Sequence, residues 1–205
     1  MTRLSSAGKI AVSRSSAEDR AQSVLFKAAD LFYRQGYDAT SMNDIAQAVE
    51  LTKAGLYYYT KGKEDLLYKI MDFAMDCVER DIVEPAEEIS DPTERLRFVV
   101  ENHLKKIFDM GAAITVLTVE VTKLQPKLEK RVALRQRAYL DLVVSTIREL
   151  KRAKKLKPLD ERLAALNVFS CILGVTRWYK PNGRFKKNRI IAETLRFIES
   201  GLIAE

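Results

Sequence analysis

The stretch TSMNDIAQAVELTKAGLYYYTKGKEDLL, residues 40–67, decides the fold. Its pattern predicts two short helices joined by a tight turn and followed by the capped start of a third helix. Apolar residues recur where two crossed helices would pack together, at Ile45, Ala46, Val49, Leu51 and Leu56. Polar and aromatic residues fall on the remaining face, at Thr52, Lys53, Tyr57, Tyr58 and Tyr59. This layout is typical of a helix-turn-helix, in which the second helix enters the major groove of DNA.

Outside this stretch the chain predicts an all-α protein of about nine helices. Glycine and proline are scarce, at 8 and 5 residues, which favours helix over other structure. We expect a flexible basic arm over residues 1–15, a DNA-binding head over 16–64 whose first helix is capped by Ser16, and a ligand-binding and dimerisation body over 65–205. Glycine, proline and capping residues place the body's helices at about 64–84, 93–110, 112–124, 126–154, 160–179 and 186–202.

Composition narrows the class of protein. A net charge of +7 biases the chain toward nucleic acid, anionic membranes or polyanionic ligands. No apolar run approaches the roughly 18 residues of a membrane span, and the N-terminus lacks a signal-peptide core, so we expect a cytoplasmic protein without membrane contact. Cys77 and Cys171 are far apart, and His103 is the only histidine, so neither a disulfide framework nor a metal site is expected.

The head resembles the TetR family of bacterial transcriptional repressors, whose pattern is close to T-x-x-x-I-A-x-x-A-G-V-S-x-G-x-L-Y-x-Y-F-x-x-K-E-x-L. The matching residues are Ile45, Ala46, Leu56, Tyr57, Tyr59, Lys63, Glu64 and Leu66. Three positions depart from the pattern. Glu50 stands at a turn glycine, so either Glu50 is strained or the turn differs slightly; Ala54 replaces a glycine of the recognition helix, and Thr60 replaces a phenylalanine.

A recognition helix needs side chains that reach base edges, together with phosphate contacts that fix its register. Lys53 can reach a guanine or a phosphate, the tyrosine hydroxyls can donate to phosphates, and hydroxyls at helix N-termini favour phosphate. By resemblance, the DNA-binding residues are Thr40, Ser41, Thr52, Lys53, Tyr57, Tyr58, Tyr59 and Lys63. Two alternatives remain open: Tyr57 packs under the head, and Lys63 is an ordinary solvated lysine.

The body carries basic clusters around residues 148–157 and 180–189, which are either a solvated surface or a docking surface for a polyanion. The tract Arg177-Trp178-Tyr179-Lys180-Pro181 and the run KEDLLY at 63–68 resemble a TetR branch that responds to acyl-CoA thioesters of fatty-acid, sterol or aromatic-acid catabolism. Candidate ligand-binding residues are Phe108, Glu120, Tyr139, Asn167, Arg177 and Trp178. Each of them is alternatively a core or surface residue without a ligand.

The last two helices carry apolar faces that can pair with a second chain in a four-helix bundle. The resemblance implies a homodimeric repressor, without cofactor, that leaves a palindromic operator when a small molecule such as an acyl-CoA binds the body. The alternative is a helical lipid or acyl-CoA carrier, or an enzyme, without DNA binding. A third interpretation is an activator or a DNA-architectural protein, which would differ in reporter output. Because no nucleophile–base set, metal cluster or phosphate-binding glycine loop is present in the sequence, we do not expect an enzyme.

Overall fold

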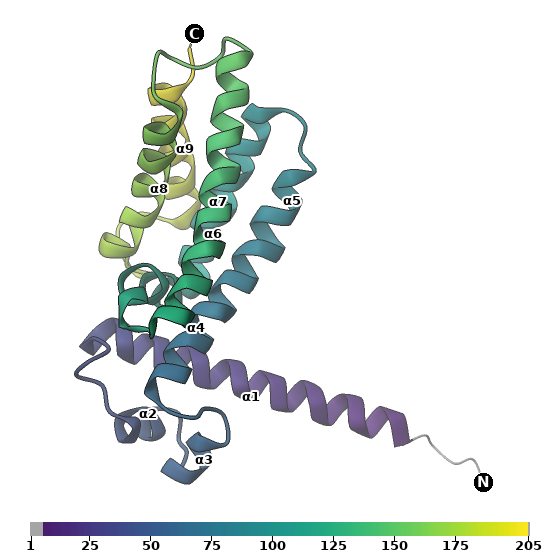
Figure 1. Cartoon of the computed structure of the whole chain (residues 1–205), viewed down its shortest axis with the longest axis vertical. Coiled ribbons are helices and arrows are strands. Elements are labelled where there is room, and N and C mark those ends of the chain that lie inside the picture. The colour runs from purple at the N-terminus through teal and green to yellow at the C-terminus, as the bar shows by residue number, and fades with distance from the viewer. Residues whose placement is uncertain (1–5, 205) are drawn as a thin grey trace. The chain divides into compact units, whose positions relative to one another are not determined.

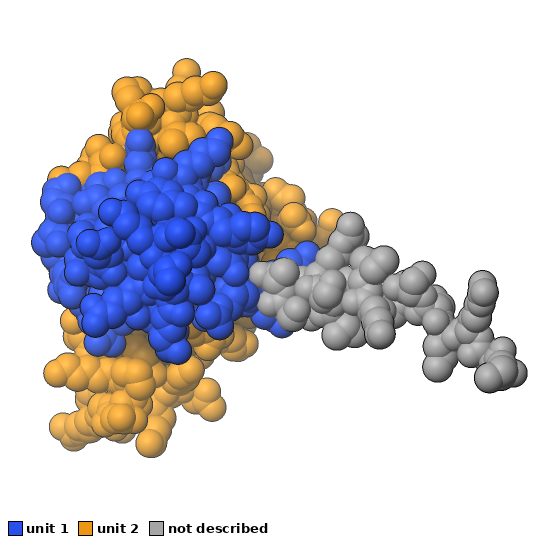
Figure 2. Space-filling view, turned by 90° about the horizontal axis from the view of Figure 1, so that it is seen from below, with its two compact units in different colours: residues 1–70 blue, residues 71–205 orange. Residues whose placement is uncertain are grey.

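A computed structural model describes residues 6–204, with side chains from Glu18 onward. Within these residues the chain forms nine α-helices, and the only β-structure is an isolated bridge between Leu156 and Ile203. The prediction of an all-α protein is therefore confirmed. The chain divides into one compact unit that ends at Ile70 and a second that begins at Met71 (Figure 2), so the boundary falls inside one helix. No described helix is long and apolar enough to cross a membrane.

The first unit contains the helix-turn-helix. It consists of α1 (Ser6–Gln35), α2 (Met42–Ala48), α3 (Lys53–Tyr57) and the start of α4 (Lys63–Val78) (Figure 1). Ser41 caps α2 in a capping box, because its hydroxyl accepts from the Asp44 N–H and the Asp44 carboxylate accepts from the Ser41 N–H. The unit closes over buried apolar side chains that come from all four helices: Val24, Ala28, Phe32, Ile45, Leu56 and Leu66.

The start of α1 differs from the prediction. The helix was expected to begin at Ser16, but it begins at Ser6 and runs through Ser16 without interruption. Residues 1–5 of the predicted arm lie outside the described residues. No proline occurs between residues 6 and 35, and alanine, lysine, arginine and glutamate have high helix propensity. The helix therefore extends toward the N-terminus past Ser16, although serine is a favoured N-cap residue.

The second unit is a helical bundle built around α6 (Pro92–Val119). This helix packs against α7 (Pro126–Arg152), α8 (Glu161–Trp178) and α9 (Lys187–Leu202) (Figure 1). A π-helical turn (Glu79–Val83) and α5 (Glu84–Glu87) lead from α4 to α6, and a 3-10 turn (Val121–Lys123) connects α6 to α7. The core is apolar and includes Leu96, Val100, Leu104, Ile114, Ile147, Ala165 and Ile172.

Two irregularities shape this bundle. The predicted fourth helix was to end before Pro85, but helical structure continues to Glu87 through the π-helical turn. Pro85 has no N–H and its ring opposes the carbonyl four residues earlier, and the widened turn immediately before it relieves both conflicts. The predicted break between the fifth and sixth helices is confirmed as a kink in α6, where Met110 has φ −142° and ψ 37°.

Candidate DNA-binding and ligand sites

The turn of the helix-turn-helix is closed by backbone hydrogen bonds. After α2, the N–H of Glu50 donates to Gln47 O and the N–H of Leu51 donates to Ala46 O, a Schellman arrangement that requires a left-handed residue after the cap. Glu50 occupies that position with φ +58°, so the expected strain at this departure from the family pattern is confirmed. Lys27 Nζ lies 3.0 Å from the Glu50 carboxylate, and this hydrogen bond lowers the pKa of Glu50.

The recognition helix α3 is held by a cap at its N-terminus and by a buried side chain in its last turn. Thr52 caps it by accepting from the Gly55 N–H at 3.0 Å, and Leu56 is fully buried. Lys53 and Ala54 are exposed on the outer face, and Tyr57 and Tyr58 are 46% and 87% exposed. Tyr57 is therefore about half exposed and can be reached by a partner. The α3 surface offers one ammonium group and two phenols to a partner.

Tyr59 is less exposed than Tyr57 and Tyr58. Its side chain is half-buried, its ring meets the Tyr58 ring edge-on at 5.2 Å between centroids, and its carbonyl accepts from Lys69 Nζ at 2.7 Å. Thr60 is buried, and its hydroxyl lies 2.9 Å from the Asp65 carboxylate at the first turn of α4. Thr60, which stands where the family pattern has phenylalanine, thus joins the segment after α3 to α4 by a hydrogen bond.

Two of the predicted DNA-binding residues face into the head. Thr40 is 1% exposed, and its hydroxyl donates to Gly36 O at 2.8 Å, so it is not available to a phosphate. Lys63 Nζ donates to three carbonyl oxygens, of Tyr37 at 3.0 Å, Asp38 at 3.3 Å and Thr40 at 3.0 Å. The same ammonium lies 4.5 Å from the centre of the Tyr37 ring. Thr40 and Lys63 therefore hold the segment between α1 and α2 in place by hydrogen bonds to its carbonyl groups.

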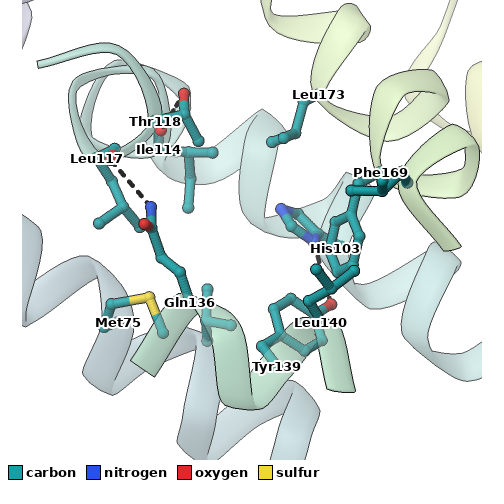
Figure 3. Close-up of a pocket in the computed structure, with 12 residues that line it drawn as sticks. Met75, His103, Ile114, Leu117, Thr118, Gln136, Tyr139, Leu140, Phe169 and Leu173 are labelled. Carbon is teal, nitrogen blue, oxygen red and sulfur yellow. Dashed lines mark hydrogen bonds between the residues drawn. The ribbon is translucent and has the colours of Figure 1, made fainter. Parts of the chain in front are cut away.

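A cavity of about 200 Å³ lies inside the second unit, between α4, α6, α7 and α8 (Figure 3). Its walls are mostly apolar, and none of the described residues that line it carries a charge. The lining residues are Met75, Val78, His103, Ile114, Leu117, Thr118, Gln136, Tyr139, Leu140, Leu166, Phe169 and Leu173. Gln136 donates to Leu117 O at 3.1 Å, and Thr118 donates to carbonyls of its own helix.

His103 is the one buried side chain, among those described, with a polar atom that lacks a partner. Its Nδ1 lies 3.1 Å from the Tyr139 hydroxyl, whereas its Nε2 has no hydrogen bond. In Figure 3 one ring nitrogen faces Tyr139 and the other faces the interior of the cavity. Burial lowers the pKa of His103 to about 4 and raises the pKa of the Tyr139 phenol, so both groups are neutral near pH 7.

Of the predicted ligand-binding residues, only Tyr139 lines this cavity. Phe108 instead stacks against Tyr179, with ring centroids 4.6 Å apart. Asn167 and Trp178 lie in surface grooves over α8 and α9. Arg177 is exposed at the end of α8, and Glu120 ends α6. His103 was not among the predicted ligand-binding residues, because a lone histidine on a helix is more often structural or exposed than a ligand. The signal in the sequence was its helical spacing to Val99, Val100 and Ile107, which places His103 on the apolar face of its helix.

Comparison with known proteins identifies the fold and its family. A model described as "Tetracyclin repressor-like, C-terminal domain" matches residues 90–202, and a model of "Bacterial regulatory proteins, tetR family" matches residues 24–70. The chain belongs to the TetR family. Members of this family are DNA-binding transcriptional regulators rather than enzymes, so the prediction of a regulator is confirmed.

Individual TetR-family relatives match over most of their length. The transcriptional regulator HbdR of Aromatoleum sp. (strain CIB) is 24% identical over 188 residues, which cover 91% of this chain and 79% of HbdR. The structure of AibR in complex with isovaleryl coenzyme A and operator DNA is 27% identical with a TM-score of 0.80, over 87% of this chain and 97% of AibR. The structure of KstR2 of Mycobacterium tuberculosis has a TM-score of 0.84 at 21% identity and supports the fold, over 91% and 96% of the two chains.

Proposed function

We propose that this TetR-family protein is a homodimeric repressor that binds a palindromic operator through α3 and leaves it when an acyl-CoA thioester enters the second unit. The observation that carries the proposal is the outer face of α3, where Lys53, Tyr57 and Tyr58 are exposed while Leu56 anchors the helix from below. A cation and phenol hydroxyls on a supported helix suit phosphate and base-edge contacts. Ser41 and Thr52, both exposed at helix N-termini, add phosphate contacts at the same end.

A second copy of the chain is the proposed partner of α8 and α9. These helices and the loop between them expose large apolar side chains, namely Leu163, Leu166, Trp178, Phe185 and Phe197. Two grooves lined by α8 and α9 residues run over the same face. Contiguous exposed apolar surface of this kind marks an interaction site. A twofold dimer also supplies the second recognition helix that a palindrome needs.

The acyl-CoA effector is supported by the cavity and by one relative. The cavity is apolar and uncharged among its described lining residues, so it suits the acyl end of such a ligand rather than its phosphates. The structure of AibR contains isovaleryl coenzyme A and operator DNA, and AibR is 27% identical to this chain where the two match. An acyl group in the cavity touches α4 directly, through Met75 and Val78.

The test is binding of the purified protein to the DNA upstream of its own gene, followed by fluorescence anisotropy with and without a panel of acyl-CoA esters. Specific binding that one ester releases supports the whole proposal. Specific binding that no ester affects leaves the regulator but removes the effector class. A protein that binds acyl-CoA but no DNA fits the carrier alternative, and an operator fused to a reporter separates repression from activation.

A further inference from the structure

The unpartnered Nε2 of His103 is the starting point. A buried N–H without an acceptor costs free energy, and most buried polar groups in proteins therefore have partners. Here the atom lies in the wall of a cavity large enough for a small molecule, and the ring is held in place by neighbours. Its centroid lies 5.7 Å from that of Tyr139, with the rings stacked, and 6.0 Å from that of Phe169.

The hydrogen bond to Tyr139 assigns the proton of the imidazole. In the described part of the chain, His103 Nδ1 is the only partner of the Tyr139 hydroxyl. If the phenol donates to Nδ1, the neutral ring carries its proton on Nε2, and only this N–H lacks a partner. If Nδ1 donates instead, the phenol proton and the Nε2 lone pair both lack partners. The first arrangement leaves fewer unpaired groups, so Nε2 is a hydrogen-bond donor that faces the cavity.

The cavity limits the size and charge of the ligand group that His103 Nε2 can bind. A dry apolar cavity of about 150 Å³ accepts a benzene ring, so the observed volume of about 200 Å³ suits a slightly larger group. A carboxylate is disfavoured, because none of the described lining residues supplies a positive charge and an unpaired buried anion is costly. The ligand group is therefore apolar, neutral and equipped with one acceptor.

We infer that the cavity holds a neutral acyl or aryl group of about five to eight non-hydrogen atoms and that His103 Nε2 donates to its carbonyl oxygen. The inference rests on the proposed acyl-CoA effector and narrows it. The uncharged lining selects a thioester over the corresponding carboxylate, His103 selects it over a thioether that lacks the carbonyl oxygen, and the volume selects short branched or aromatic acyl groups over long chains. Tyr139 acts as a positioning residue, since it fixes the tautomer of His103 and does not itself have to meet the ligand.

Three small probes test this inference by calorimetry: the thioester S-isovaleryl-N-acetylcysteamine, the thioether of the same shape without the carbonyl oxygen, and isovalerate. Wild-type protein is expected to bind the thioester about tenfold more tightly than the thioether, which corresponds to about 1.4 kcal/mol. Isovalerate is expected to bind more weakly than either. A lauroyl thioester of the same carrier is expected to gain nothing over the isovaleryl compound.

Variants at position 103 separate recognition from folding. His103→Leu is expected to bring the thioester-to-thioether ratio close to one while thioether binding persists. His103→Gln, which keeps an N–H donor, is expected to restore part of the ratio. Equal affinities in the wild type, a ratio that survives in His103→Leu, or no binding of any probe each overturns the inference. Binding of the wild type to its operator without ligand is measured in parallel. If the protein binds the operator but the probes overturn the inference, only the inference and the effector class fail. If the protein does not bind the operator, the proposed regulator is refuted.

Discussion

Acidification is expected to destabilise this protein through His103 before its carboxylates titrate. His103 is the only histidine, and burial lowers its pKa from 6.5 to about 4 in the folded state. The unfolded chain keeps the ordinary value, so it takes up a proton at a higher pH than the folded chain does. Stability from the neutral ring is therefore fully present above pH 6.5, decreases as the pH falls through 6.5, and stops decreasing below about pH 4.

The magnitude follows from the difference between the two pKa values. The whole shift corresponds to about 3 kcal/mol, of which about 2 kcal/mol is lost between pH 7.5 and pH 5.0. Urea unfolding at both pH values, at a fixed protein concentration, measures the loss. His103→Leu and His103→Gln have no group that titrates in this window at that position, and carboxylate contributions common to all three proteins cancel in the comparison.

The expected result is a pH-dependent loss in the wild type that exceeds the loss in both variants by about 2 kcal/mol. Equal losses in all three proteins refute the reasoning, because they show that His103 titrates alike in the folded and unfolded states. An independent check is the NMR signal of the imidazole. In the folded protein it is expected to remain that of a neutral ring down to about pH 5, and a titration centred at pH 6.5 contradicts the burial argument.

Four further substitutions test the head and the body. Lys63→Met is expected to lower the unfolding free energy by about 2 kcal/mol and to leave the salt dependence of operator binding unchanged. Loss of a phosphate contact would instead reduce the slope of log affinity against log salt concentration by about one, and Lys61→Met, at an exposed lysine, is the control. Lys53→Ala is expected to weaken operator binding about tenfold at unchanged melting temperature, and unchanged affinity excludes Lys53 from the interface. Glu50→Gly is expected to raise the urea midpoint, because glycine accepts φ +58° without strain. A lower midpoint would show that the ion pair between Lys27 and Glu50 stabilises the fold by more than the strain at Glu50 costs. Arg135→Met is expected to cost about 2 kcal/mol in urea unfolding, because it leaves three carboxylates on α4 and the π-helical turn without their shared guanidinium, and an unchanged midpoint refutes this.

Most helix limits were predictable because local chemistry sets them. Asp91 accepts from the N–H groups of Thr93 and Glu94, Asp160 caps α8 in the same way, and Pro126 begins α7. Such signals act over three or four residues and are legible in the sequence. The π-helical turn was not predicted, since the expectation that a proline ends a helix ignores the option of widening the turn before it.

The candidate DNA-binding face was predictable only in part. The sequence pattern assigned Leu56 to the core and Lys53 and Tyr57 to the surface, and in the structure Leu56 is fully buried while Lys53 and Tyr57 are exposed. Thr40 and Lys63 lie in or next to connecting segments, where no periodicity indicates the direction of a side chain. Motif membership suggested contact with DNA, but the positions of backbone carbonyls, which depend on the folded loop, direct both residues inward.

The cavity could not be predicted from the sequence, for a geometric reason. It is the space that four helices leave unfilled, and its lining joins Met75 on α4 to Leu173 on α8 through residues that each resemble ordinary core. Tyr139 was among the predicted ligand residues because it is a polar group near an apolar run. His103 became a candidate only when its two nitrogens could be told apart, one bound to Tyr139 and one without a partner.

The α7 helix is the element that can convert occupancy of the cavity into a change in α4. Gln136 and Tyr139 line the cavity, while the adjacent Arg135 holds Asp72 and Asp76 on α4 at 2.7 Å and 2.6 Å. A ligand that turns or shifts α7 must therefore move α4 or break charged hydrogen bonds, which are the stronger kind. Since α4 begins in the unit that carries α3, its displacement is the route we propose from ligand to operator. A ligand shifts such an equilibrium only by its difference in affinity for the two states, so the proposed acyl ligand must fit one arrangement of α7 better than the other.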